Sequence, residues 1–153
     1  MLDLATQLIR EEEGSRQFVY DDATGGYIRA TSKVIGTPTI GIGRNVSPSG
    51  PGLYPAEIEF LLANDVAHYT AQAALLDGFS KLNPVQQAVL VAMVQQMGLG
   101  GVRGFHAFCA AIARGDVATA ADEGRKSAWD NQVKARAQRE MQMLSSGVWV
   151  DKK

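Results

Sequence analysis

The stretch LIREEEGSRQFVYDDATGGYIRATSKVIGTPTIGIGRN (8–45) contains the change from a helical to a β pattern that decides the fold. Before Gly14, apolar residues recur at helical spacing with Asp3 as the expected N-cap, which predicts a helix over 3–13. Three β-branched or aromatic segments follow, separated by Gly, Thr and Asp: FVY (18–20), GYIR (26–29) and PTIGIG (38–43). These segments predict a small antiparallel sheet near the N-terminus.

The rest of the chain has helical patterns. Turn residues fill NVSPSGPG (45–52), and Pro55 suits the first turn of a long helix over about 55–77. Asn83-Pro84 opens a core helix that GLGG (98–101) interrupts. Further helices are predicted over 105–114, from the cap Asp116 to about 124, and over about 133–146.

The predicted fold class is therefore α+β, mostly helical, in a single domain with two lobes. The N-terminal lobe is expected to cover about 14–60 and to contain the sheet. The long helix is expected to join it to a helical lobe of about 78–153, which also takes in the helix over 3–13.

Composition excludes several classes of protein. A hydrophobic fraction of 46% and a charged fraction of 20% argue against disorder and against a membrane span. The single Cys109 cannot form an intramolecular disulfide, and two histidines offer no Cys/His metal cage, so neither metal nor cofactor is expected. The acidic start lacks the basic end and apolar run of a signal peptide, so we expect synthesis in a cytoplasm without stable membrane insertion.

Charge is unevenly distributed along the chain. Residues 1–76 carry five Lys/Arg and nine Asp/Glu (−4), whereas residues 77–153 carry ten and seven (+3). A basic half attracts an anionic polymer, although a solvated helix face explains the charge equally well. Nucleic acid is not the expected polymer, because no stacking aromatics interleave with the cations.

Two carboxyl groups are the strongest candidates for chemistry. Glu13 closes the first predicted helix, and Asp22 lies nine positions later in the turn DDATGG. Glycoside hydrolysis needs such a pair, one carboxyl that donates a proton and one that stays ionised. The helical pattern does not exclude Glu12, which lies nearer the centre of the apolar stripe.

These motifs resemble the active-site region of phage lysozymes, glycoside hydrolase family 24, of the T-even phage type. In that family a Glu before Gly is followed by eight residues, an Asp, and a Thr that opens a TIGxG segment; Glu13, Asp22 and Thr39 match these positions. The resemblance continues through NDV (64–66), VQQMG (94–98), GF (104–105), KSAWDNQ (126–132), RAQRE (136–140) and GVW (147–149).

The resemblance implies a lysozyme-like fold and hydrolysis of the β-1,4 bond between N-acetylmuramic acid and N-acetylglucosamine in peptidoglycan, for host cell lysis. It makes Glu13 the general acid, Asp22 the group that supports the developing cation and the attacking water, and Thr39 a residue that holds this water. Inversion at the anomeric carbon is expected, which needs carboxyls roughly 6.5–9.5 Å apart.

The resemblance also implies supporting roles. Arg136 is expected to pair with Glu13 from the other lobe, while Asn45 and Gln96 are expected to contact substrate. Phe105 and Trp129 are either cleft residues or packing residues. Gly41 lets the strand approach the sugar, or it is a turn glycine. We expect a monomer that acts on peptidoglycan after release through a holin lesion or as part of a virion.

The chain departs from the family pattern in one long segment. Sixteen residues separate Asp22 from Thr39 where the familiar pattern has five, so IRATSKVIGTP (28–38) is an apparent insertion. Thr31 is the alternative third residue, although TIGIG favours Thr39. Arg44 replaces a common His, and Ala128 replaces an Arg before Trp.

Two other functions are compatible with this sequence. A lytic transglycosylase would need the acid but no Asp/Thr pair. An inactive wall-binding or tail-structural module would keep the fold alone.

Overall fold

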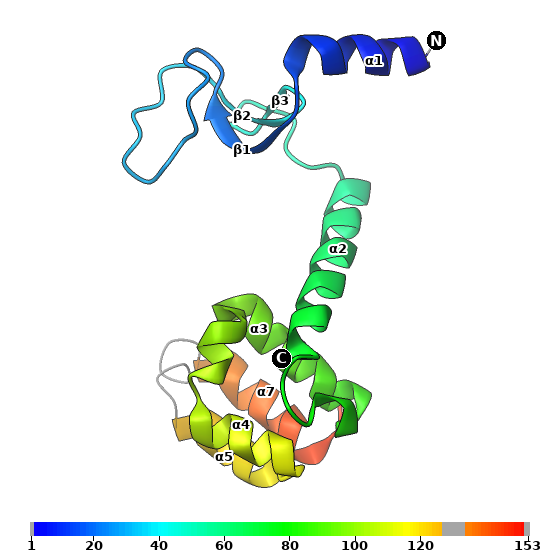
Figure 1. The fold of residues 1–153 in the computed structure, drawn as a ribbon, viewed down its shortest axis with the longest axis vertical. Coiled ribbons are helices and arrows are strands. Elements are labelled where there is room, and N and C mark those ends of the chain that lie inside the picture. Colours follow the sequence, from blue (N-terminus) through cyan, green and yellow to red (C-terminus); the bar gives the residue numbers. More distant parts are fainter. Residues whose placement is uncertain (1, 127–133, 152–153) are drawn as a thin grey trace. The chain divides into compact units, whose positions relative to one another are not determined.

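The computed structural model describes residues 2–126 and 134–151 (Figure 1). These residues form α-helices and one three-stranded antiparallel sheet, which confirms the predicted α+β class. The chain divides into two compact units, Met1–Glu59 and Phe60–Lys153. The sheet belongs to the first unit, and the second unit is helical.

Helix α1 (Leu2–Glu13) opens the first unit. Because the helix begins at Leu2, Asp3 lies in its first turn and not at the N-cap, contrary to the prediction. Gly14 follows with a φ of 64°, a conformation that glycine adopts without steric cost, and its N–H donates to Arg10 O at 3.1 Å. The three glutamates therefore end the helix where the sequence predicted.

The sheet has the order β1 (Arg16–Asp21), β2 (Pro38–Gly41), β3 (Arg44–Asn45). The strand predicted over 26–29 was wrong, since this segment contributes only an isolated bridge between Tyr20 and Tyr27.

The third strand comes instead from Arg44 and Asn45, of which Asn45 was predicted to begin a turn. Gly41 and Gly43 have φ values of 65° and 72°, so the chain reverses within a few residues and Arg44 pairs with Ile40. The two glycines of TIGIG, Gly41 and Gly43, therefore produce a hairpin and not one long strand.

Helix α2 (Pro55–Ala73) begins beside β3. Arg44 Nη1 donates to both carboxylate oxygens of Glu57, at 2.6 and 2.7 Å, and Glu57 Oε2 also accepts from Tyr54 N at 2.7 Å. The helix ends at Ala73, a few residues before the predicted end.

The second unit is built on helix α3 (Pro84–Arg103). Asn83 and Gln86 form a reciprocal capping box at its start, each side chain accepting from the other's backbone N–H at 3.0 Å. The predicted interruption is confirmed at Gly98, where φ is 73° and ψ is 161°, but the helix resumes at once and ends at Arg103.

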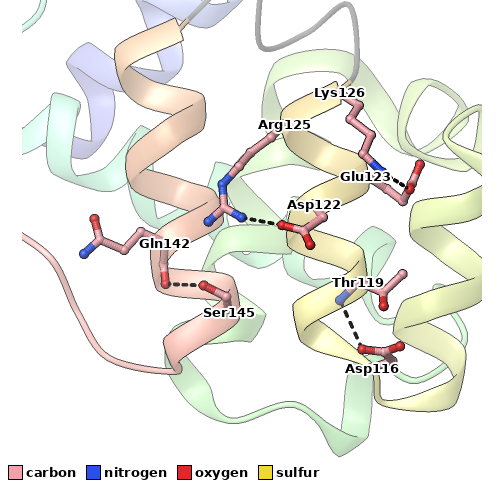
Figure 2. A network of polar contacts seen from close by, with 8 residues as sticks. All are labelled: Asp116, Thr119, Asp122, Glu123, Arg125, Lys126, Gln142 and Ser145. Atoms are coloured by element: carbon pink, nitrogen blue, oxygen red, sulfur yellow. Dashed lines mark hydrogen bonds and ion pairs between the residues drawn. The ribbon is translucent and has the colours of Figure 1, made fainter.

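Three further described helices complete this unit: α4 (His106–Arg114), α5 (Val117–Lys126) and α7 (Lys134–Ser146). The predicted Asp116 cap is confirmed, because its Oδ1 accepts from Thr119 N at 3.1 Å (Figure 2). A short 3-10 helix η1 (Phe79–Lys81), which the sequence analysis did not predict, precedes α3.

The core lies in the helical unit, where α5 packs on both α4 and α7. Gly124 of α5 permits close packing, since a methyl group there would overlap Met141 Sδ of α7. The largest fully buried side chains are Phe108, Leu90, Met93, Ile112, Met141, Leu144, Val89, Val94 and Val102. None of the helices in the described part of the chain combines the length and apolar character needed to cross a membrane.

Candidate active site

Glu13 lies against the hairpin of the sheet. A methyl group built on Gly43 would stand 2.8 Å from Glu13 Oε2 and 2.9 Å from its carboxyl carbon. The carboxyl therefore occupies the space that any side chain at position 43 would need. Glu12, the alternative that the helical pattern left open, is exposed like Glu13, but no such contact is described for it.

Asp22 continues the pairing of β1 with β2 by one residue. The register pairs Asp21 with Pro38, and Asp22 N then donates to Thr37 O at 3.1 Å. In return Thr37 N donates to Asp22 Oδ1 at 2.5 Å. The exposed carboxylate thus has one oxygen bound to the backbone just before β2.

Thr39 lies within β2, opposite Tyr20 of β1 and Asn45 of β3. Its side chain is buried, and its hydroxyl donates to Thr37 O at 3.0 Å. This bond uses the hydroxyl proton, so the oxygen keeps its ability to accept.

The segment 37–43 therefore contains Thr39, contacts Asp22 at its start and contacts Glu13 at its far end, while the separation of the two carboxyls that inversion needs stays a prediction. Asp22 binds Thr37, Thr39 lies two positions later, and Glu13 contacts Gly43. Thr31, the alternative third residue, lies in the loop before this segment and is exposed.

Two other predicted site residues belong to the same unit. Asn45 Oδ1 accepts from Ser47 N at 2.8 Å, so its side chain shapes the turn after β3. Gly41 has positive φ, and a methyl group there would meet nothing within 4 Å. Open space beside Gly41 is compatible with both roles that the sequence left open for it.

The remaining predicted residues lie in the helical unit. Gln96 is half-buried on α3, and its Nε2 donates to Ala92 O at 3.4 Å. Phe105 is half-buried and packs against the core, which is compatible with a packing role. Their contacts with substrate stay predictions, and Ala128 and Trp129 lie outside the described residues.

Arg136 has a partner that the sequence analysis did not single out. Its Nε donates to Glu140 Oε1 at 2.6 Å, one helical turn along α7. Glu140 is only 4% exposed, and its Oε2 has no hydrogen-bond partner among the described residues. Burial raises the pKa of Glu140, an effect that the bond from Arg136 opposes.

The i, i+4 spacing of these two residues in RAQRE was a signal for this pair. The predicted pairing of Arg136 with Glu13 stays a prediction.

Arg44, which stands where a His is common in the family pattern, forms an ion pair with Glu57 at 2.6 Å. Its guanidinium also lies 5.2 Å from the centre of the Tyr54 ring. The added positive charge is therefore compensated within the unit.

The described residues contain no group of three or more His, Cys, Asp or Glu that would hold a metal ion. Cys109 is half-buried, its thiol donates to Val102 O at 3.3 Å, and burial raises its pKa. These features indicate a packing residue and not a nucleophile.

Comparison with known proteins gives one informative similarity. No family model matches the chain. Over 161 residues the chain is 29% identical to the pre-baseplate central spike protein Gp5 of Enterobacteria phage T4. The similarity covers 92% of this chain but 27% of that protein, so the chain spans about a quarter of its relative's length. The chain is thus similar, at a distance, to one part of a bacteriophage protein.

Proposed function

We propose that this chain is a muramidase that hydrolyses the β-1,4 bond between N-acetylmuramic acid and N-acetylglucosamine in peptidoglycan. The observation that carries the proposal is the placement of Glu13, Asp22 and Thr39 along one strand and its flanks. Glu13 packs on Gly43, and Asp22 is bound by Thr37 N–H. The resemblance to family 24 phage lysozymes supports the same three residues.

In this reaction Glu13 donates its proton to the glycosidic oxygen as the bond to the anomeric carbon breaks. Asp22 stays ionised, supports the positive charge that develops on the sugar, and takes a proton from the attacking water. The oxygen of that water becomes the new anomeric hydroxyl, with inversion. Thr39, whose hydroxyl oxygen keeps its lone pairs, helps to hold the water.

The phage relative suggests where the activity is used. Gp5 is a central spike protein of the pre-baseplate by name. We therefore favour wall cleavage as part of a virion over release of a separate enzyme through a holin lesion. Peptidoglycan is the partner in both cases.

A second candidate is a structural spike module that has the fold without the activity. The name of the relative favours this candidate, because it describes a structural part of the particle. A test of catalysis separates the two functions.

The test compares Glu13→Gln with Glu12→Gln on purified peptidoglycan. Loss of the general acid is expected to lower the rate by about 10³-fold, while the neighbouring substitution leaves the rate near that of the unchanged protein. Circular dichroism establishes that each variant is folded.

Mass spectrometry of the products identifies the reaction. Hydrolysis yields a reducing muramic acid, whereas a lytic transglycosylase yields an anhydro-sugar end. A folded protein that releases neither product would be a structural module. Near-normal clearing by Glu13→Gln would contradict the assignment of the acid.

A further inference from the structure

Both ends of the loop that contains the apparent insertion are hydrogen-bonded to one buried side chain, that of Asp21. Its Oδ1 accepts from Ala23 N at 3.0 Å and from Gly36 N at 2.9 Å, and its Oδ2 accepts from Ile35 N at 2.7 Å. The residue is 4% exposed. One carboxylate thus joins the first residues of the loop 23–37 to its last residues.

Backbone groups close the same loop near its start. Asp21 N donates to Gly26 O at 2.9 Å, and Gly25 N donates to Asp21 O at 2.8 Å. Arg16 Nη1 adds a bond to Gly25 O at 2.6 Å. The side chain of Asp21, in contrast, accepts hydrogen bonds from Ile35 N and Gly36 N at the far end.

The far end of the loop is in turn packed against Asp22. Thr37 N donates to Asp22 Oδ1, and Gly36 lies so close that a methyl group there would overlap Asp22 Oδ1 and stand 2.6 Å from Ala23 Cβ. Glycine at position 36 is therefore required by close approach, since its φ is not in the left-handed region.

We propose that Asp21 is a positioning residue, whose carboxylate fixes residues 35–37 so that the Thr37 N–H and the Gly36 backbone hold the carboxylate of Asp22 in place. The importance of this contact for catalysis rests on the proposed function. The contact itself is a property of the loop that is measured without substrate.

The chemistry of Asp21 supports this role. Three backbone donors point at an ionised carboxylate, which makes charge-assisted hydrogen bonds stronger than those of a neutral side chain. The bond from Ile35 N lowers the pKa of Asp21 most, and burial opposes this effect. An amide in its place has only one acceptor atom, so it cannot accept from all three donors in the same way.

The experiment uses the whole chain with two variants that act differently. Asp21→Asn weakens the anchor itself, and Gly36→Ala leaves the Asp21 carboxylate in place but fills the space beside Asp22 and Ala23. Gly26→Ala is the matched control, because it lies in the same loop, has no positive φ, and its added methyl group would meet only Thr24 Oγ1 at 3.5 Å.

The first readout is independent of activity. Hydrogen exchange of the Ile35, Gly36 and Thr37 amides, followed by NMR, is expected to speed up by at least about tenfold in Asp21→Asn and to be unchanged in Gly26→Ala. In Gly36→Ala the Thr37 amide is expected to lose its bond to Asp22. Unchanged exchange in both test variants would overturn the proposal.

The second readout is steady-state cleavage of peptidoglycan fragments. A carboxylate misplaced by about 1 Å costs on the order of 100-fold in rate, so both test variants are expected to lose kcat by at least tenfold with KM within about twofold. Gly26→Ala should retain both constants. Faster amide exchange with unchanged kcat would also overturn the proposal, because the loop would then not position the carboxylate of Asp22 for catalysis.

If the unchanged protein cleaves no glycan, the proposed function fails. The exchange measurement then still decides whether Asp21 holds residues 35–37 against Asp22.

Discussion

Glu13 owes its position to a residue without a side chain. Its carboxyl lies within 2.9 Å of where the Cβ of position 43 would be, and Gly43 also has a φ of 72°. The motif TIGIG thus serves two purposes, a tight hairpin and a surface that admits an acidic side chain. Neither purpose tolerates a larger residue at its second glycine.

Substitution of Gly43 by Ala is expected to lower glycan cleavage by at least about tenfold, because the new methyl group displaces the Glu13 carboxyl. Strain at positive φ adds a stability cost of about 1 kcal/mol. The rate of peptidoglycan cleavage and the free energy of unfolding are measured together.

Gly52→Ala is the matched control, since Gly52 has a φ of 63° but a methyl group there meets nothing within 4 Å. It should share the stability cost and keep the rate. An equal loss of activity in both variants would show that strain, and not the contact with Glu13, is responsible.

Among the elements, α3 is fixed at its start by contacts with the end of α7. Beyond the capping box, Asn83 Nδ2 donates to Gly147 O at 3.1 Å and Gln86 Nε2 donates to Leu144 O at 3.0 Å. Two side chains therefore cap one helix and bind the exposed carbonyls that end another.

Asn83→Ala is expected to lower the free energy of unfolding by about 1–2 kcal/mol, because it removes the cap of α3 and the bond to Gly147. Asn83→Asp keeps an acceptor for Gln86 N but loses the donor, so a smaller loss is expected. Urea denaturation followed by circular dichroism measures both. Equal losses would assign the effect to the bond with Gly147 and not to the cap.

The elements also show what the sequence was able to predict. Helices with long apolar periods and clear caps, such as those opened by Asn83 and Asp116, were predicted within a few residues. The strand predicted over 26–29 does not form, because its residues have β propensity but make only an isolated bridge to β1, between Tyr27 and Tyr20. Strand β3 escaped prediction because two residues carry no periodicity.

The candidate site was predictable only in part. Glu13, Asp22 and Thr39 stand in a recognisable motif, and the structure brings all three to one segment. The roles of Asp21 and Gly36 could not be predicted from the sequence, because their contacts join positions up to fifteen residues apart and involve backbone groups. A sequence pattern shows the type of each side chain and the spacing of apolar residues, but it does not indicate hydrogen bonds between residues so far apart in the chain.

For the molecule as a whole, charge and pH are expected to act mainly on the helical unit. That part of the chain carries most of the basic residues, and it contains Glu140, a carboxyl buried beside Arg136. A buried acid with an unpaired oxygen is destabilising when it ionises.

Because burial raises the pKa of Glu140 above its ordinary value of 4.5, the folded state binds this proton more tightly than the unfolded chain does. Protonated Glu140 therefore contributes fully to the free energy of unfolding below about pH 4.5, and this contribution is lost as pH rises through the raised pKa. The slope is at most ~1.4 kcal/mol per pH unit. Glu140→Gln is expected to flatten this decline in urea unfolding curves recorded between mildly acidic and neutral pH.

The exposed Glu59→Gln serves as the control and should follow the unchanged protein. An identical pH profile for Glu140→Gln would refute the assignment to Glu140.

The loop that ends at Thr37 also has a practical consequence. Its tip forms a turn of its own, with Ser32 N donating to Arg29 O and Ser32 Oγ accepting from Arg29 N, each at 2.9 Å. Because Asp21 is hydrogen-bonded to both ends of the loop, residues added at the tip are expected to leave the positions of the strands unchanged. Each doubling of such a loop costs only about 0.6 kcal/mol. The tip is consequently the natural place to graft a fluorophore or an epitope onto this protein without moving its strands.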